Sequence, residues 1–249
     1  MTVAEGADVT ENTLLGGRVR LRQPVRGYRA GMDAALLAAA VDAQPGQRVI
    51  EAGCGAGAVL TQIAARRPGV ELVGLERDPA AAALARENLS LNALEGEIRQ
   101  GDVAEGFAAL RLAPFDWAIG NPPFFDDEGA LRAPSPARRG AWIADDGLAA
   151  WTAFLLKAVR EGGRIVIIHR ADRLADILAL LAPKAGSFAI RPIHPFADEP
   201  AKRVLVQAIK TGKAPLRLLP PLVLHDRSGA KHTPAAEAIV RGEAALAFD

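Results

Sequence analysis

The sequence predicts an α/β protein in which helices cover both faces of a mostly parallel sheet. Two patterns point to this class. Short apolar strands alternate with helical stretches from residue 48 onward, and the first strand, Arg48–Ala52, runs directly into a glycine-rich loop. Strands that are separated by helices pair in parallel and are buried on both faces. The length of 249 residues suits one domain of this kind.

Residues 1–13 are expected to form a flexible polar tail, so that a single domain spans residues 14–249. Strands are predicted at Arg48–Ala52, Glu71–Leu75, Glu97–Gln100, Phe115–Ile119, Arg164–Ile168, Phe188–Ile193 and Arg203–Lys210. Helices are predicted at Asp33–Val41, Ala58–Arg66, Pro79–Asn92, Leu148–Arg160 and Asp172–Leu181.

Local signals set several of these boundaries. Pro45-Gly46 ends the first helix, and Asp78 followed by Pro79 is a typical N-cap and first helical residue. Gly162-Gly163 is expected to close the helix that begins at Leu148. The last two strands lack a helix between them, which predicts an antiparallel pair. In the segment 211–249, we expect one short strand and a helix that begins at Pro234.

Composition excludes several classes of protein. Hydrophobic residues make up 50% and charged residues 24% of the chain, as in globular proteins, and the longest apolar run, Ala34–Val41, is too short to span a membrane. A single cysteine, Cys54, excludes an intramolecular disulfide and a cysteine-rich zinc site, and the four histidines lack metal-ligand spacing. We therefore expect no bound metal. The acidic start of the chain does not resemble a signal peptide, so we expect a cytoplasmic protein. The composition does not indicate an oligomeric state.

The glycine-rich segment is Glu51-Ala52-Gly53-Cys54-Gly55-Ala56-Gly57. Alternating glycines after a buried strand allow a tight turn and let a ligand lie against the backbone. Glu76 ends the next predicted strand, about 20 residues later, where a carboxylate can accept hydrogen bonds from both ribose hydroxyls. The segment therefore predicts a nucleotide-type site that includes Glu51, Gly53, Cys54, Gly55, Gly57, Glu76 and its neighbour Arg77.

Two ligands compete for this loop. Gly53, Gly55 and Ala58 also match the dinucleotide pattern G-x-G-x-x-G/A, which would make the protein a dinucleotide-dependent oxidoreductase. The acidic Glu51, however, disfavours a pyrophosphate and favours a cationic or zwitterionic ligand such as S-adenosylmethionine (SAM). A turn that binds nothing is the third alternative. Asp102, followed by Val103, ends the third predicted strand, where a carboxylate can accept from the adenine amine or can simply cap a turn.

The segment Asn121-Pro122-Pro123-Phe124 follows the fourth strand and is the strongest signal in the sequence. The Asn121 side-chain carbonyl and the Pro122 carbonyl are two rigid acceptors, which can hold both hydrogens of a planar NH₂ group. This arrangement would aim the nitrogen lone pair at a methyl donor, and Phe124 would stack on the planar group that carries the amine. A proline turn beside a core aromatic residue is the alternative.

In this order, the glycine segment, Glu76, Gly101-Asp102 and Asn121 to Phe124 resemble the SAM-dependent amino-methyltransferases. The resemblance covers roughly residues 27–210 and implies a class I Rossmann-like fold, with a mostly parallel seven-stranded sheet and an antiparallel last strand. It is strongest for the family that methylates N6 of an adenine in a valine tRNA, because of Tyr28 to Leu37, Phe125, Ser135-Pro136 and Arg138-Arg139.

The resemblance implies roles for several residues. Asp33 would help to position SAM, Glu76 would hold the ribose, Asp102 would accept from the adenine amine, and Asn121 to Phe124 would bind the target. Adenine-modifying relatives often carry Tyr where Phe124 stands, whereas Phe also occurs in ribosomal guanine-N2 methyltransferases. Guanine N2 in ribosomal RNA therefore stays open as an alternative target, as does a protein glutamine.

Arginines favour RNA over a protein substrate. Arg18, Arg20, Arg22, Arg26 and Arg29 precede the glycine loop without an acid among them, and Arg132, Arg138 and Arg139 follow the proline segment. Because the net charge is only +1, any basic surface must be local. We expect RNA, in particular tRNA, to contact Arg29, Arg138 and Arg139 beside Phe124 and Phe125, with a target base turned out of its stack.

Overall fold

The computed structural model describes residues 9–25, 29–123, 147–227 and 229–248. Its centre is a nine-stranded sheet in the order β10-β8-β9-β7-β6-β3-β4-β5, with β11 also paired to β8. The long strands are β3 (Arg48–Ala52), β4 (Glu71–Glu76), β5 (Glu97–Gln100), β6 (Phe115–Gly120), β7 (Val159–Arg170), β8 (Ala185–His194) and β9 (Arg203–Lys210). The expected parallel sheet is confirmed: all these strands pair in parallel except β9, which is antiparallel to both β7 and β8.

Two further strands enlarge the expected seven-stranded sheet. β10 (Arg217–Leu218) and β11 (Leu222–Val223) are two residues each and pair in parallel with β8. The expected helix from Pro234 is confirmed as α7 (Pro234–Arg241), which Thr233 caps by accepting a hydrogen bond from the Ala236 amide.

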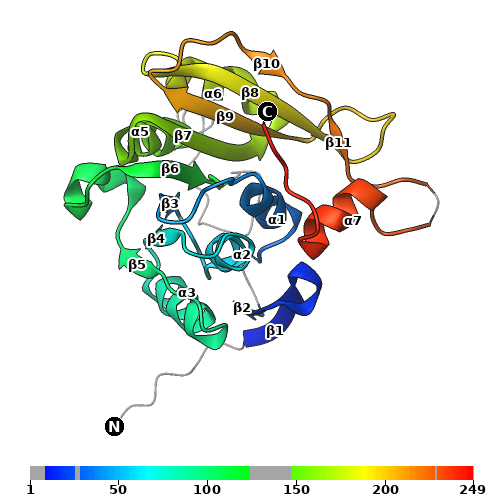
Figure 1. Cartoon of the computed structure of the whole chain (residues 1–249), viewed down its shortest axis with the longest axis horizontal. Coiled ribbons are helices and arrows are strands. Elements are labelled where there is room, and N and C mark those ends of the chain that lie inside the picture. Colours follow the sequence, from blue (N-terminus) through cyan, green and yellow to red (C-terminus); the bar gives the residue numbers. More distant parts are fainter. Residues whose placement is uncertain (1–8, 26–28, 124–146, 228, 249) are drawn as a thin grey trace, which may run out of the picture.

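Helices cover both faces of the sheet, and each face has its own apolar core. α1 (Met32–Ala39), α2 (Ala58–Arg66), α3 (Pro79–Leu91) and α7 pack on one face, where Leu36, Leu60 and Leu89 are buried. α5 (Leu148–Ala158) and α6 (Leu174–Leu181) pack on the other face, around Phe154 and Ile177. Figure 1 shows α1 and α2 in front of the central strands.

Short 3₁₀ turns join several of these elements, at Leu15–Gly17, Val103–Glu105, Phe107–Leu110 and Ala171–Arg173. The last of them corrects the expected helix start at Asp172, because α6 itself begins at Leu174. Within the residues that the structure describes, no helix is both long enough and apolar enough to cross a membrane.

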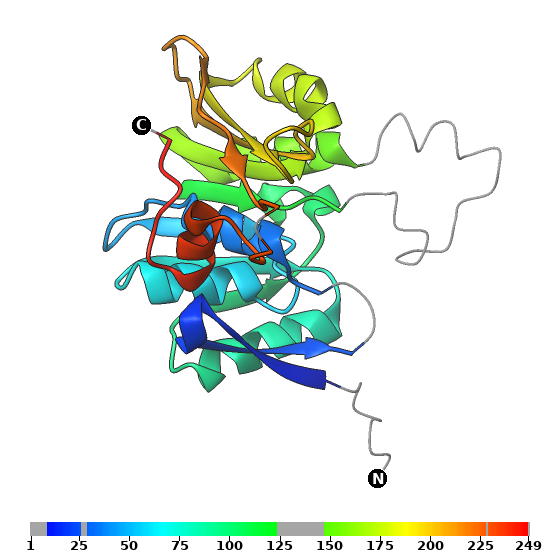
Figure 2. The same cartoon turned by 90° about the vertical axis from the view of Figure 1, so that its right-hand side faces the viewer.

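The structure corrects the expected polar tail. Residues of that segment form β1 (Val9–Leu14), which pairs with β2 (Val19–Pro24) as an antiparallel hairpin. β1 is exposed along nearly its whole length, so its residues show no apolar alternation that sequence reading could detect. The hairpin lies beside α3, at the opposite end of the molecule from β10 (Figures 1 and 2).

The end of α5 also differs from the expectation. The helix stops at Ala158, and Gly162-Gly163 do not cap it but lie inside β7. The β6–β7 register shifts between Phe115 and Trp117, and a side chain at position 163 would come within 2.8 Å of the Asp116 carbonyl oxygen. Glycine at this position therefore allows β6 and β7 to approach each other. The prediction that Gly162-Gly163 ends the helix was wrong.

Candidate active site

The strand order reverses between β3 and β6, since β4 and β5 lie on one side of β3 while β6 and the later strands lie on the other. In parallel sheets, ligands bind outside the carboxyl ends of the strands at such a reversal. The glycine loop follows β3, Glu76 ends β4, Asp102 follows β5 and Asn121 follows β6. The fold thus brings the residues predicted from sequence to one edge of the sheet.

The glycine loop leaves open space at its centre. Gly53, Gly55 and Gly57 have φ values of 62°, 53° and 79°, in the left-handed region that favours glycine. A side chain at position 55 would meet no atom of the described residues within 4 Å, whereas one at position 53 would collide with the ring of Trp151. A ligand could therefore lie against Gly55, whereas the ring of Trp151 occupies the space beside Gly53.

Glu76 is fixed by the backbone around it. Its Oε2 accepts a hydrogen bond from the Gly55 amide at 2.8 Å, and its Oε1 accepts one from the Asp78 amide at 2.9 Å. Each carboxylate oxygen has a second lone pair. The side chain can therefore shape the glycine loop and still accept hydrogen bonds from a ribose.

Glu51 lies buried behind the loop, with 2% of its surface exposed. Its Oε2 has no hydrogen-bond partner among the residues that the structure describes. Burial, and the negative charge of Glu76 nearby, raise the pKa of the Glu51 carboxyl well above its ordinary value. A cationic ligand group would relieve both effects, so the site fits the amino group and sulfonium of SAM better than a pyrophosphate.

Cys54 contributes backbone rather than thiol chemistry. Its amide donates to the Leu75 carbonyl oxygen at 2.9 Å, which ties the loop to β4. Burial, Glu51 and Glu76 raise the pKa of the thiol, so it stays protonated.

Asp102 and Arg77 form the rim beside β4 and β5. Asp102 caps the turn Val103–Glu105 by accepting from the Ala104 amide at 2.9 Å, and its Oδ2 lies 3.8 Å from Nη1 of Arg77. Asp102 therefore caps a turn, as the alternative interpretation expected. Among the described residues, its Oδ2 has only the long ion pair with Arg77, so this oxygen can still accept a hydrogen bond from a ligand. Val103 is half-buried and packs against the core under α5.

Two further predicted residues are engaged within the protein. Asp33, in α1, pairs with Arg203 at 3.1 Å. Arg29 donates to the Thr10 hydroxyl, the Pro24 carbonyl and the Asn12 side chain, each at 2.8 Å, which uses its guanidinium to hold the β1–β2 hairpin. An RNA contact of Arg29 would have to compete with these bonds.

Asn121, Pro122 and Pro123 follow β6 directly, next to the glycine loop, because β6 pairs with β3 up to Gly120 and Ala52. Phe124, Phe125, Arg138 and Arg139, which were also predicted for the site, lie outside the described residues.

Sequence reading missed Trp151. This residue of α5 packs against both Gly53 and Gly120, the residues that follow β3 and end β6. Its ring thereby links the glycine loop to the strand that leads to Asn121. A tryptophan in an apolar helix carries no signal for such a role.

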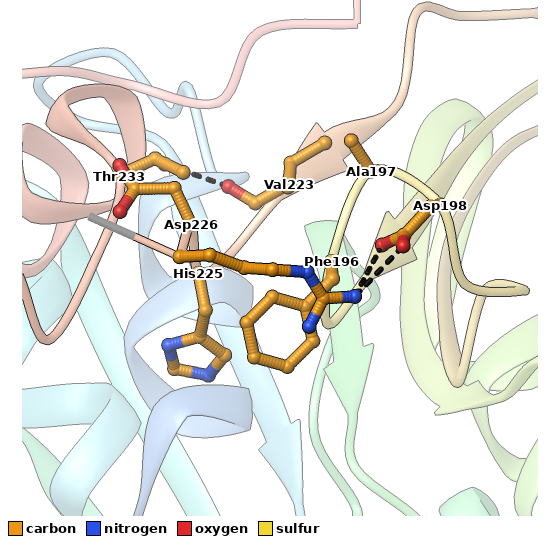
Figure 3. A pocket seen from close by; sticks show the side chains of 8 residues that line it. Phe196, Ala197, Asp198, Val223, His225, Asp226 and Thr233 are labelled. Atoms are coloured by element: carbon orange, nitrogen blue, oxygen red, sulfur yellow. Dashed lines mark hydrogen bonds and ion pairs between the residues drawn. The ribbon is translucent and has the colours of Figure 1, made fainter. Parts of the chain in front are cut away.

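A separate hollow of about 370 Å³ lies between the β8–β9 connection, β11 and the start of α7 (Figure 3). Phe196 and His225 line it, with ring centroids 5.6 Å apart, and Arg227 covers Phe196 while pairing with Asp198. None of the residues predicted for the site lines this hollow.

Among the residues that the structure describes, no group of three or more His, Cys, Asp or Glu side chains could hold a metal ion.

Comparison with known proteins agrees with the fold. Residues 29–133 match the family model of the methyltransferase small domain. The tRNA1(Val) (adenine(37)-N6)-methyltransferase of Yersinia pestis is 32% identical over 179 residues, which is 70% of each chain.

Solved structures show the same fold. A predicted O-methyltransferase from Agrobacterium tumefaciens is 30% identical, with a TM-score of 0.71 over 86% of this chain and 98% of that one. The 16S rRNA N2 G1207 methyltransferase of Thermus thermophilus, solved with AdoMet and guanosine, is 23% identical, with a TM-score of 0.57 over 82% of this chain and 50% of that one.

The glycine loop at the point where the strand order reverses, the buried Glu51 and these matches lead to one conclusion: the chain belongs to the methyltransferase small domain family and is a SAM-dependent methyltransferase.

Proposed function

We propose that this enzyme transfers the methyl group of SAM to N6 of an adenine in tRNA. The observation that carries the proposal is the position of Asn121-Pro122-Pro123, directly after β6 and beside the glycine loop. A target amine held there would lie next to the SAM site. The name of the Yersinia relative, an adenine-N6 methyltransferase of tRNA, supports the choice of base and substrate.

The residues would divide the work as follows. Glu51, Glu76 and Asp102, with the backbone of Gly53 to Gly57, would bind SAM, which supplies an electrophilic methyl group. The Asn121 side-chain oxygen and the Pro122 carbonyl would accept the two amine hydrogens, so that the nitrogen lone pair faces the methyl group. Because the extra proton of the amine could leave after methyl transfer, the residues that hold the amine would not need to include a strong general base.

Substrate capture would depend on Phe124 and on arginines. Phe124 would stack on the base, Phe125 would also bind the substrate, and Arg138 and Arg139 would contact phosphates. Arg20 and Arg22 are about half exposed, but both pair with Glu11. This shared negative charge would reduce their contribution to phosphate binding.

Guanine N2 is the second candidate target, because Phe124 stands where adenine-modifying relatives often carry Tyr. A protein glutamine is the third. To decide among them, the enzyme is incubated with SAM labelled in the methyl group and, separately, with unmodified tRNA, ribosomal RNA and a release-factor protein. The products are digested and analysed by mass spectrometry. We expect labelled N6-methyladenosine from tRNA alone, whereas labelled N2-methylguanosine or methylglutamine would overturn the proposed target.

A further inference from the structure

A buried asparagine in α3 joins the glycine loop to the β1–β2 hairpin. Asn88 is fully buried and uses both ends of its amide. Its Oδ1 accepts from the Arg22 amide at 2.8 Å, and its Nδ2 donates to the Arg22 carbonyl at 2.8 Å and to the Ala56 carbonyl at 2.9 Å. Three segments far apart in the sequence therefore meet at one side chain.

The second partner, Ala56, belongs to the glycine loop, and the inference rests on the proposed function, in which this loop binds SAM. Ala56 lies between Gly55 and Gly57, so its carbonyl orientation sets the path of the loop on which SAM rests. A backbone carbonyl that is shielded from water needs a hydrogen-bond partner, and Asn88 supplies one to this half-buried residue. α3 also limits the loop sterically, because a side chain at position 57 would lie 3.2 Å from the Cβ atom of Ala85.

One turn later, Asn92 repeats the contact with the hairpin but not the contact with the loop. Its Oδ1 accepts from the Arg20 amide and its Nδ2 donates to the Arg20 carbonyl, both at 2.7 Å. Its remaining bond goes to the Asn88 carbonyl of its own helix, at 2.7 Å. The two asparagines thus hold neighbouring parts of β2 in the same way, and only Asn88 reaches the glycine loop.

We propose that Asn88 is a positioning residue for SAM. Its side chain couples the β1–β2 hairpin to the glycine loop, so that the attached hairpin stabilises the loop conformation that binds SAM, and bound SAM stabilises the attachment of the hairpin. Such coupling is reciprocal: if the hairpin raises the affinity for SAM, SAM must stabilise the attachment of the hairpin. The hairpin, which adds nothing to the central sheet, thereby becomes part of the SAM-binding unit.

The test compares Asn88→Asp with the matched control Asn92→Asp. Each substitution keeps the shape of the side chain and replaces the donating NH₂ group with a carboxylate oxygen, which repels the facing carbonyls. The dissociation constant of S-adenosylhomocysteine is measured by calorimetry, and folding by circular dichroism. We expect about tenfold weaker binding for Asn88→Asp, the effect of about one hydrogen bond, and less than about twofold change for Asn92→Asp.

Equal effects of the two substitutions would overturn the proposal, because both weaken the hairpin and only one alters the loop. If Asn88→Asp does not fold, the pair Asn88→Ser and Asn92→Ser replaces it under the same criterion.

A second measurement needs no variant. Hydrogen exchange at single amides is followed by NMR in the wild-type protein, with and without S-adenosylhomocysteine. We expect the ligand to slow exchange of the Arg22 amide, which Asn88 holds, more than that of the Arg20 amide, which Asn92 holds. Equal slowing of both amides, or none at Arg22, would show that Asn88 only supports the fold.

Discussion

Glu51 and Glu76 lie near the same loop, but the fold treats their carboxyl groups differently. Glu76 accepts two backbone hydrogen bonds, whereas Glu51 is buried with one oxygen unpartnered among the described residues. Without a bound cation, the charged form of Glu51 is disfavoured by burial and by the Glu76 charge, so its pKa is raised. At a pH between the ordinary glutamate pKa and the raised pKa, the folded, ligand-free protein therefore binds a proton at Glu51 that the unfolded chain has released.

Glu51→Gln should change how stability depends on pH. In the wild-type protein, the free energy of unfolding should fall as pH rises from the ordinary glutamate pKa of 4.5 toward the raised value, since the folded state binds more protons in that window. Glutamine removes this dependence. At about pH 8 and without SAM, the free energy of unfolding of Glu51→Gln, measured with urea, should exceed that of the wild type by more than about 1 kcal/mol. The reason is that a pKa difference of one unit between the folded and unfolded states corresponds to about 1.4 kcal/mol.

The same variant should bind SAM more weakly, because it lacks the charge that the cationic ligand requires. Parallel stability curves for the two proteins between pH 4 and pH 8 would contradict the assignment of a buried, neutral carboxyl at this position.

Asn121→Ala should abolish turnover but leave SAM affinity within about twofold, because the proposed partner of its side chain is the target amine. We expect a loss of at least about 100-fold in turnover, the effect of removing one preorganised transition-state hydrogen bond. Methyl transfer to tRNA is measured under single-turnover conditions, and binding of S-adenosylhomocysteine serves as the control. Substantial methyl transfer by this variant would exclude the proposed amine clamp.

At the scale of elements, the sequence predicted best where burial and turn chemistry act together. β3, β9 and α2 have the expected bounds, because each is an apolar run or helix that ends at a glycine or a charged residue. β5 also has the expected bounds, although Ile98 is its one buried residue. The hairpin was missed because β1 is held by polar bonds, with Glu11, Asn12 and Thr10 accepting from arginines and a glutamine. These partners are set by the tertiary fold, so no local period reveals them.

The candidate site was predictable in part for the same reason. Glu51 and Glu76 lie at the carboxyl ends of β3 and β4, and the glycines follow β3. In a parallel sheet, the carboxyl ends of the strands meet at one edge. The contacts of Trp151 and Asn88 depend instead on how α5 and α3 pack across the sheet. Spacing along the chain does not encode those distances.

Trp151 should prove essential for the connection between α5 and the site. Trp151→Ala leaves Gly53 and Gly120 without their packing partner, and we expect a loss of up to about 3 kcal/mol in the free energy of unfolding, at the low end for a tryptophan because the residue is only half-buried. SAM affinity should fall as well. Trp151→Phe keeps an aromatic ring there and should retain most of both quantities. Urea unfolding measures the free energy of unfolding, and calorimetry measures the SAM affinity. Full SAM affinity in a folded Trp151→Ala protein would show that Trp151 contributes only to packing.

Arg138 and Arg139 are predicted to bind RNA, and salt dependence tests this. Changing both to glutamate should weaken tRNA binding and flatten the plot of log affinity against log salt concentration, by roughly 0.7–0.9 for each phosphate that the protein no longer neutralises. Binding of S-adenosylhomocysteine is the control and should be kept. An unchanged slope would indicate that these arginines only solvate the surface.

At the scale of the whole molecule, ligand linkage separates SAM from a dinucleotide. A ligand that binds only the folded state, at about 100 times its dissociation constant, adds about 2.7 kcal/mol to the free energy of unfolding. We therefore expect S-adenosylhomocysteine to raise the melting temperature and NAD to leave it unchanged. A shift with NAD alone would contradict the interpretation of Glu51 as a residue that selects a cationic ligand.

Arg18 connects residues from nearly opposite ends of this chain. Its guanidinium donates to the Leu15 carbonyl, at the turn of the hairpin, and to the carbonyls of Arg241 and Gly242 at the end of α7. During synthesis, the hairpin emerges first, yet these two bonds cannot form until residue 242 has left the ribosome. At roughly 5–20 residues per second, the Arg18 side chain would wait for more than about ten seconds before these two partners are available. The turn of the hairpin therefore gains its last contacts only after the rest of the domain has been made, and a nascent chain that pauses before α7 should leave this turn more accessible to proteases.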